Sequence, residues 1–508
     1  MSKEQKQVVN HILLNRDFVI LIQGRAGTGK TTMMTEAVRA IESRGKQVFA
    51  FAPTAEASRG VLRAEGFEKA DTVASLLTDK KYHHLIKGQV IWIDEAGLIG
   101  SRDMLKVLKL AQQQNCRVIF TGDDRQHRAV DRGDAFRILK DIACLPVVGT
   151  QTIYRQWQKD YREAVADLAE GKTAQAFGKL EKMGAVKECG TDQIIEALTN
   201  DYVETVKTGK MALAISPTHK EREKINDSIR SHLQVLKMVS TQNRAFTKLQ
   251  SLNFTEAQKS DPFNYKVGMV IQTHSKLSET LPKGGKATVE KVENGQLYIK
   301  NEKGEHSVLP LEQSSRFTVF NRKAIALAKG DLIGINKNGF DRNKSRLNNG
   351  QILEIKGFTK DGHIKANTAS SSNRINHKEY LIDRSHENLD YAYCQTSYAS
   401  QGKTVDRVFI HQPSATFPAS SQEQFYVSVS RGRDSVTIYT DDVEALRIVT
   451  EGSGRRLSAM ELDTHPFILG LEEKPELRSN SIRSDQKPEA IPPPSHIKRR
   501  SHGFSPAI

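Results

Sequence analysis

The sequence has few cysteines and no long apolar run. Its four cysteines, Cys116, Cys144, Cys189 and Cys394, are scattered over 508 residues, and no two of them form a CxxC pair. This spacing argues against a zinc site or a disulfide framework and favours buried or free thiols in a reducing compartment. No apolar run is long enough to cross a membrane, and no signal peptide is recognisable. These absences favour a cytoplasmic protein with no membrane partner.

Acidic residues are also in deficit. The chain has 60 Asp and Glu against 75 Lys and Arg, which gives a formal net charge of +15. Such an excess favours a polyanionic partner, with nucleic acid as the first expectation. An anionic membrane surface is the weaker alternative, because no basic amphipathic helix stands out. A third alternative is a basic protein without a polyanionic partner. The length allows roughly three or four domains.

The strongest positive signal lies at residues 18–34. Residues 18–23 form a short apolar run that predicts a buried parallel strand, and a helical stretch follows Thr31. Between them, residues 24–31 read GRAGTGKT and match G-x-x-x-x-G-K-[ST] in full. Lys30 would supply charge to the β- and γ-phosphates, and the Thr31 hydroxyl would bind Mg²⁺. The preceding strand and the following helix argue against a chance glycine-rich turn.

The backbone of this segment would wrap a polyphosphate, because glycines let the N–H groups turn inward and a helix N-terminus adds partial positive charge. We therefore predict binding of a nucleoside triphosphate with Mg²⁺, which the family resemblance given below narrows to ATP. The predicted nucleotide-binding residues of this segment are Gly24, Arg25, Ala26, Gly27, Thr28, Gly29, Lys30, Thr31 and Thr32.

A pair of carboxylates follows another apolar run. Asp94 and Glu95 come directly after residues 90–93, which are predicted to form a strand. Asp94 could hold the Mg²⁺ that bridges the phosphates, and Glu95 could orient and activate the attacking water. The alternative is an acidic helix N-cap, which is common in isolation. The pairing with the phosphate-binding segment favours the catalytic interpretation.

The order of predicted elements indicates a doubly wound α/β domain that extends to about residue 150. Residues 117–121 are expected to form a further strand, and the polar residues after it would face the ligand crevice at the carboxyl ends of the strands. Gln126 lies there and could contact the γ-phosphate. Residues 1–15 are predicted to be helical, and on sequence alone Gln5 is a surface glutamine in that helix.

The second half repeats this plan with an interruption. A strand at residues 211–215 leads into Ser-Pro-Thr-His and a helix, much as residues 50–58 do, which suggests a second α/β domain. From residue 267 to about residue 385, short alternating segments separated by turn residues predict one or two inserted β-barrels. A strand at residues 391–396 would restore the α/β pattern. From about residue 471 the composition predicts a disordered basic tail.

Taken together and in this order, the motifs of roughly residues 1–445 resemble those of a superfamily-1 helicase of the RecD-like group. The chain is most similar to the helicase part of conjugative relaxases of the TraI/TrwC (MobF) type. This resemblance implies an α/β fold with two RecA-like doubly wound parallel-sheet domains and a small SH3-like β-barrel inserted in the second. The implied divisions are residues 1–156, 157–266, 267–388 and 389–446, followed by the tail at 471–508.

The resemblance also assigns roles to residues that carry little signal alone. Gln5 would recognise adenine, Gln126 would sense the γ-phosphate, and Arg155 and Arg431 would act as arginine fingers. Gly402 would contact nucleotide in a loop that couples nucleotide state to the grip on DNA. The residues implied to contact nucleic acid are Pro53, Thr54, Pro217, Thr218, His219, Thr396 and Gln401.

The chain departs from the family pattern in two respects. Tyr398 stands near the position where the family usually has a histidine. No histidine cluster or catalytic-tyrosine context of a relaxase is recognisable. We therefore expect a stand-alone helicase, a fragment of a longer protein, or one partner of a split system.

The expected activity is ATP-dependent, 5′-to-3′ translocation on single-stranded DNA, with separation of tailed duplex DNA. A relaxase or the conjugation machinery is the expected protein partner. One alternative is an RNA helicase, and another is a DNA-binding recruitment module with a vestigial ATPase. A P-loop kinase or transporter ATPase is disfavoured, because it explains none of the motifs beyond residue 200.

Overall fold

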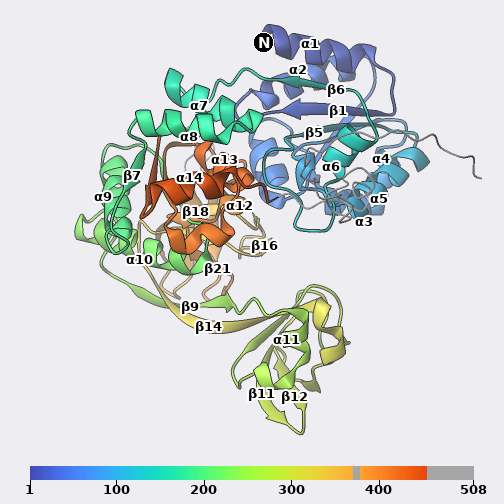
Figure 1. The fold of residues 1–508 in the computed structure, drawn as a ribbon. Helices are drawn as coiled ribbons and strands as arrows, with labels where there is room; N and C mark the ends of the chain where they lie inside the picture. Colours follow the sequence, from blue (N-terminus) through green and yellow to red (C-terminus); the bar gives the residue numbers. More distant parts are fainter. Residues whose placement is uncertain (370–377, 455–508) are drawn as a thin grey trace, which may run out of the picture. The chain divides into compact units, whose positions relative to one another are not determined.

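The computed structural model describes residues 1–369 and 378–454 (Figure 1). The tail predicted at residues 471–508 lies outside the described residues. Within the described ranges, no helix combines the length and apolar character that crossing a membrane requires.

The first domain is built on a six-stranded parallel sheet with the order β3-β2-β4-β5-β1-β6. Each predicted strand of this domain is present. Two strands escaped prediction: β3 has only two residues, and β6 has a single buried residue among its four. The bounds are β1 (Val19–Gly24), β2 (Val48–Ala52), β3 (Asp71–Thr72), β4 (Val90–Ile93), β5 (Arg117–Gly122) and β6 (Val147–Thr150).

Helices cover both faces of this sheet, because successive side chains of each strand point to opposite sides. Ile20 and Ile22 of β1 pack in one apolar cluster with residues of α1 and α2, whereas Leu21 belongs to the opposite cluster with residues of α3 and α5. The helical segments are α1 (Lys3–Leu14), α2 (Lys30–Glu42), η1 (Glu56–Leu62), α3 (Val73–Thr78), α4 (Lys80–Leu85), η2 (Ala96–Leu98), α5 (Ser101–Gln113), α6 (Ala135–Arg137) and η3 (Ile138–Ile142).

The second domain holds a five-stranded parallel sheet with the order β22-β8-β23-β24-β7. The predicted α/β class with two parallel-sheet domains is therefore confirmed. The strands are β7 (Val186–Glu188), β8 (Ala212–Ile215), β22 (Cys394–Gln395), β23 (Val405–His411) and β24 (Gly432–Thr440). The helical segments are α7 (Lys159–Glu170), α8 (Thr173–Lys182), α9 (Ile194–Lys207), α10 (His219–Val235), α12 (Ser397–Ser400), η6 (Ser414–Ala419), α13 (Gln422–Val429) and α14 (Val443–Glu451).

The strand predicted at residues 391–396 is wrong as a single element. The structure divides this stretch between β21 (Leu389–Tyr391), which pairs with an inserted strand, and β22, which joins the parallel sheet. The whole stretch is buried, apart from the partly exposed Thr396. Its composition therefore gives no sign of the change of sheet between Tyr391 and Cys394.

Among the described residues, two larger antiparallel sheets lie between β8 and β22 in the sequence, together with a two-stranded antiparallel sheet of β16 and β17. The first has the order β13-β12-β11-β10-β14-β9 and the second β20-β19-β18-β15-β21. Their elements are β9 (Arg244–Ser251), α11 (Glu256–Ser260), η4 (Pro262–Asn264), β10 (Val270–Thr273), β11 (Lys286–Glu293), β12 (Gln296–Asn301), β13 (His306–Val308), η5 (Leu311–Arg316), β14 (Phe317–Leu327), β15 (Leu332–Ile335), β16 (Gly339–Phe340), β17 (Arg346–Leu347), β18 (Ile352–Phe358), β19 (Ile364–Thr368), β20 (Glu379–Ile382) and β21.

The inserted β region begins before the predicted residue 267. Strand β9 pairs with β14 from Arg244 to Ser251, and Figure 1 shows the two strands running side by side toward β11 and β12. The sequence RAFTKLQS hides this strand because its buried positions do not alternate regularly with exposed ones. The likeness to an SH3 barrel stays a prediction.

A buried histidine in the second sheet gives the fold a pH-dependent component. His411 ends β23, is 2% exposed, and its Nδ1 has no hydrogen-bond partner among the described residues. Burial lowers the pKa of His411 to about 4. The pKa of a histidine in the unfolded chain is about 6.5, so between about pH 6.5 and about pH 4 the unfolded chain binds a proton that the folded chain does not. The contribution of neutral His411 to the free energy of unfolding is therefore fully present above about pH 6.5 and declines on acidification.

We expect His411→Gln to make the thermal midpoint less sensitive to acidification than it is in the unmodified chain. Between about pH 6.5 and about pH 4, the free energy of unfolding should fall with decreasing pH less steeply in the variant, by at most about 1.4 kcal/mol per pH unit. Differential scanning calorimetry across this range measures it. Identical slopes for the two proteins would contradict the prediction.

Candidate nucleotide-binding site

The phosphate-binding loop joins the end of β1 to the start of α2, as the sequence predicts. Gly27 and Gly29 have φ angles of 79° and 73°, in the left-handed region that favours glycine. At Gly24, an added Cβ would lie 2.3 Å from Lys30 Cδ. The missing side chain at Gly24 therefore leaves the space through which the lysine side chain passes.

Lys30 and the predicted carboxylate pair lie together. Lys30 Nζ is 3.6 Å from Glu95 Oε1, and both side chains are largely buried. Burial opposes the charge on Lys30, but Glu95, Asp94 and Asp123 outweigh it and raise the lysine pKa. Burial likewise opposes the charge on Glu95, but Lys30 and Arg431 outweigh it and lower the glutamate pKa. Glu95 is therefore an ionised carboxylate at neutral pH.

Asp94 has the surroundings expected of a cation ligand. Burial, with the neighbouring Glu95 charge, raises the pKa of Asp94 to about 6 against the opposing charge of Lys30. Its Oδ1 is buried and has no hydrogen-bond partner among the described residues. Those residues contain no group of three or more His, Cys, Asp or Glu side chains that could hold a metal alone. The donor set thus fits a Mg²⁺ ion that takes most of its ligands from phosphate and water.

Glu95 also has an uncommon backbone conformation. Its φ angle is 51°, in the left-handed region that few residues other than glycine adopt. Non-glycine residues in this region cost stability and concentrate at functional sites. The turn from β4 into η2 thereby presents the Glu95 carboxylate toward Lys30.

Gln5 is buried, which corrects the surface position expected from sequence alone. Its Nε2 donates to the carbonyl oxygens of Thr28 at 3.1 Å and Gly29 at 3.3 Å. Its Oε1 accepts from the Ser2 backbone N–H at 2.9 Å as part of a capping box at the start of α1. Gln5 therefore supports the phosphate-binding loop, and the sequence signal for this position is the capping pattern Ser-x-x-Gln.

Gln126 lies after β5, at the carboxyl edge of the sheet. Its Nε2 donates to Asp123 Oδ2 at 3.0 Å, and its buried Oε1 has no partner among the described residues. Asp123 is 2% exposed and was not among the predicted site residues. Its place in the Gly-Asp-Asp turn directly after β5 is the signal that could have identified it.

The two predicted arginine fingers meet where the domains come together, with Arg155 next to the phosphate-binding loop and Arg431 in the second domain. Arg155 Nη1 donates to the Ser430 carbonyl at 3.0 Å, and Arg431 Nε donates to the Val427 carbonyl at 2.7 Å. Burial, together with the charge of Arg155, lowers the pKa of Arg431 to about 9. An added Cβ at Gly27 would lie 2.7 Å from Arg155 Cβ, so the backbone of Arg155 lies against the phosphate-binding loop.

The predicted coupling loop also reaches the Glu95 carboxylate. Gln401 Nε2 donates to Glu95 Oε2 at 3.3 Å, so this predicted DNA-contacting residue lies on the nucleotide side. Thr396 caps α12, and Gly402 has a φ angle of 81°. The nucleic-acid role of Thr396 and Gln401 stays a prediction.

Tyr398 makes an aromatic contact between the two parallel-sheet domains. Its ring stacks on His127 with centroids 3.7 Å apart and an interplanar angle of 12°. The ring nitrogen Nε2 of His127 hydrogen-bonds to Ser397 Oγ at 2.9 Å. Burial lowers the pKa of His127 to about 3, so this histidine is neutral. The family departure at Tyr398 therefore supplies a stacking contact to the first domain.

The remaining predicted nucleic-acid residues occupy matching positions on the two sheets. Pro53 and Thr54 follow β2, and Thr54 Oγ1 accepts from the Ala57 N–H at 3.1 Å. Pro217, Thr218 and His219 follow β8, and Thr218 caps α10. Their contact with nucleic acid stays a prediction.

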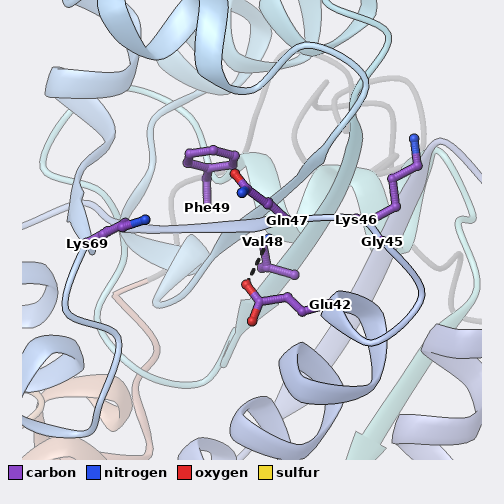
Figure 2. A pocket seen from close by; sticks show the side chains of 7 residues that line it. All are labelled: Glu42, Gly45, Lys46, Gln47, Val48, Phe49 and Lys69. Atoms are coloured by element: carbon purple, nitrogen blue, oxygen red, sulfur yellow. Dashed lines mark hydrogen bonds between the residues drawn. The ribbon is translucent and has the colours of Figure 1, made fainter.

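A separate pocket of about 420 Å³ lies at the opposite end of β2 from the phosphate-binding loop. Figure 2 shows Glu42, from the end of α2, bonded to the Val48 N–H at 3.4 Å within it. The pocket touches none of the predicted site residues. Its lining consists of Glu42, Gly45, Lys46, Gln47, Val48, Phe49 and Lys69.

Comparisons with known proteins agree with the helicase interpretation. A family model described as an AAA domain matches residues 1–191, and one described as the viral superfamily 1 RNA helicase core domain matches residues 299–440. The chain is 29% identical over 211 residues to the conjugal transfer protein TraA of Rhizobium radiobacter, covering 40% of this chain and 19% of TraA. It is 30% identical over 166 residues to the RecD2 DNA helicase of Deinococcus radiodurans, covering 32% of this chain and 22% of RecD2.

The chain spans about a fifth of the length of the TraA proteins that it matches. The multifunctional conjugation protein TraI of Escherichia coli is 28% identical over 193 residues, covering 36% of this chain and 11% of TraI. A solved structure of a Bacteroides Pif1 helicase with ADP-AlF3 and single-stranded DNA covers 92% of this chain and 97% of its own, with 16% identity and a TM-score of 0.43. Over the matched segments the chain is similar to superfamily-1 helicases, including TraA, TraI and RecD2, as its motifs predict.

Proposed function

We propose that this chain is an ATP-dependent DNA helicase that moves 5′ to 3′ on single-stranded DNA and acts in conjugative DNA processing. The observation that carries the proposal is the convergence of two sets of side chains. Lys30, the Asp94–Glu95 pair and Gln126 come from the first domain, and Arg431 reaches the same cluster from the second. Such a convergence is what hydrolysis between two domains requires.

The side chains have distinct tasks in this proposal. Lys30 binds the β- and γ-phosphates, and the ionised Glu95 accepts a proton from the attacking water. Arg155 and Arg431 stabilise the charge that develops on the transferring phosphoryl group. Asp94 and Thr31 would hold Mg²⁺, which supplies charge neutralisation to the phosphates when it is bound. Gln5 would orient adenine from beneath the loop.

Hydrolysis would drive movement because the two domains close on nucleotide and open after it leaves. The loops at residues 53–54 and 217–219 would then bind the single DNA strand alternately. The net charge of +15 supports sequence-independent contact with phosphates, whose strength falls with salt. We further propose a cytoplasmic location, action on tailed duplexes, and a relaxase or another conjugation component as partner.

The proposal is tested by strand displacement with ATP and Mg²⁺ on duplexes that carry either a 5′ or a 3′ single-stranded tail. Unwinding from the 5′ tail alone is expected. Unwinding from the 3′ tail alone would overturn the proposed polarity. DNA-stimulated ATP hydrolysis without unwinding would indicate a translocase that needs a partner.

Lys30→Ala is expected to abolish ATP turnover and leave single-strand binding largely intact, because it removes phosphate contacts and no predicted DNA contact. Lys46→Ala is the matched control, since Lys46 belongs to the same domain and bonds to the Gly88 carbonyl away from the site. ATP hydrolysis and fluorescence-anisotropy binding of a labelled oligonucleotide measure the two properties. Unchanged turnover in Lys30→Ala would contradict the site assignment.

An RNA helicase is a second candidate, favoured by the description of the model that matches residues 299–440. The ATPase residues are shared by both functions, so stimulation of ATP hydrolysis by single-stranded RNA and DNA separates them. A recruitment module with a vestigial ATPase is disfavoured by the intact set of charged residues around Lys30.

A further inference from the structure

One helix of the second domain places a tyrosine inside the nucleotide site of the first. Tyr426 lies on α13 and is fully buried. Its hydroxyl accepts from the Ala26 backbone N–H at 3.0 Å and donates to Asp123 Oδ2 at 3.0 Å. A single phenol therefore joins the phosphate-binding loop to the turn after β5.

Asp123 extends this connection to the predicted γ-phosphate sensor. The same oxygen, Asp123 Oδ2, accepts from Gln126 Nε2 at 3.0 Å, while Asp123 Oδ1 accepts from the Arg125 N–H at 3.2 Å. Burial and the adjacent Asp123 carboxyl raise the pKa of Tyr426 well above its ordinary value, so the phenol keeps its proton. The chain of bonds from Ala26 through Tyr426 and Asp123 ends at Gln126.

The other end of α13 holds the arginine finger. Arg431 Nε donates to the Val427 carbonyl of α13 at 2.7 Å, and its Nη2 donates to Ser430 Oγ at 2.7 Å. Val427 is the neighbour of Tyr426 in the chain. Arg431 lies two residues beyond the end of α13 and is tied back to it through Val427, so Tyr426 and Arg431 are expected to move together relative to the first domain.

We propose that Tyr426 is a positioning residue for ATP hydrolysis. It holds Gln126 and the phosphate-binding loop in a fixed position relative to Arg431. This proposal rests on the proposed helicase function. Tyr426 takes part in no bond-making step and acts through Asp123 and the Ala26 N–H. Because both bonds cross from one domain to the other, they form only when the domains meet.

The consequence for catalysis is a dependence of Gln126 on domain closure. When α13 is in place, Asp123 is held by the Tyr426 hydroxyl, and the Gln126 amide is held by Asp123. When α13 withdraws, Asp123 and the phosphate-binding loop lose the Tyr426 hydroxyl, and the site loses Arg431. A misplacement of catalytic groups by about 1 Å can cost about a hundredfold in rate.

The test is the steady-state kinetics of DNA-stimulated ATP hydrolysis by Tyr426→Phe, which keeps the ring and removes the hydroxyl. We expect kcat to fall by about tenfold to a hundredfold while KM for ATP stays nearly constant. Tyr439→Phe is the matched control, because the Tyr439 hydroxyl also bonds to a carboxylate, Asp201, but within the second domain. The control is expected to keep its kcat.

A double-mutant cycle separates positioning from a general loss of stability. Asp123→Asn leaves one acceptor oxygen where the carboxylate has two, and it should reduce kcat similarly. The combined variant should lose little more than either single variant, because the two residues act as one unit. Fully additive losses, or a loss confined to KM, would overturn the proposal.

The two proposals fail in different ways. An unmodified chain without nucleic-acid-stimulated ATPase would overturn both the helicase function and the role of Tyr426. An active unmodified chain with the same kcat in Tyr426→Phe would overturn only the role of Tyr426.

Discussion

Replacing Glu95 with glutamine is expected to slow ATP hydrolysis by about 10²- to 10⁴-fold, the range typical of a lost general base. The amide has nearly the same size and keeps an oxygen next to Lys30, whose Nζ lies 3.6 Å from Glu95 Oε1. It cannot take a proton from water. The loss should therefore appear in kcat, with ATP binding preserved.

Rapid-quench measurement of a single turnover, combined with equilibrium binding of ATP, checks this result. Glu36→Gln is the matched control, because Glu36 lies on α2 of the same domain and pairs with Arg39 on the surface. A Glu95→Gln variant with weakened ATP binding and an unchanged chemical step would contradict the role assigned to Glu95.

Replacing Arg431 with lysine is expected to reduce kcat by about 10³-fold or more, the range measured for arginine fingers. Lysine keeps the positive charge but loses the planar fork that donates to Val427 and Ser430 while facing the site. Charge on the transferring phosphoryl group would then lack a fixed partner. The effect on KM should be much smaller than the effect on kcat.

Steady-state ATPase kinetics and a thermal melt of Arg431→Lys measure these effects separately. The melt is needed because Arg431 is 2% exposed and bonds to its own helix. Arg447→Lys provides the control, since Arg447 pairs with Glu181 in the same domain at 2.7 Å, away from the nucleotide site. A fall in melting temperature that accounts for the whole loss of activity would overturn the finger assignment.

The sequence predicts the first domain well because its signals are local. Apolar runs mark β1, β2, β4 and β5, and the glycine-rich loop marks the site between β1 and α2. The Asp94–Glu95 pair is found for the same reason, as polar residues at the end of a buried strand. Strand β3 escapes because two residues carry no usable period, and β6 escapes because only one of its four residues is buried.

The site contacts that the sequence does not show are those made with distant parts of the chain. Gln5, expected at the surface from its own helix alone, contacts Thr28 and Gly29, and Tyr426, which was not predicted, meets Asp123 from the other domain. No periodicity within α1 or α13 encodes these partners. The same reason explains the wrong strand at residues 391–396, where the change of sheet depends on which distant strand is available for pairing.

The order of the strands in the second parallel sheet has a consequence for how the chain folds. Strand β8 pairs with β22 and β23, but both antiparallel sheets lie between β8 and β22 in the sequence. Joining β8 to β22 without them would require closing a very long loop, at a high entropic cost. Once the antiparallel sheets have folded, their hydrogen bonds shorten the effective loop. We therefore expect the parallel sheet to be completed late during synthesis, after the β region is made, with the edge of β8 open to mispairing until then.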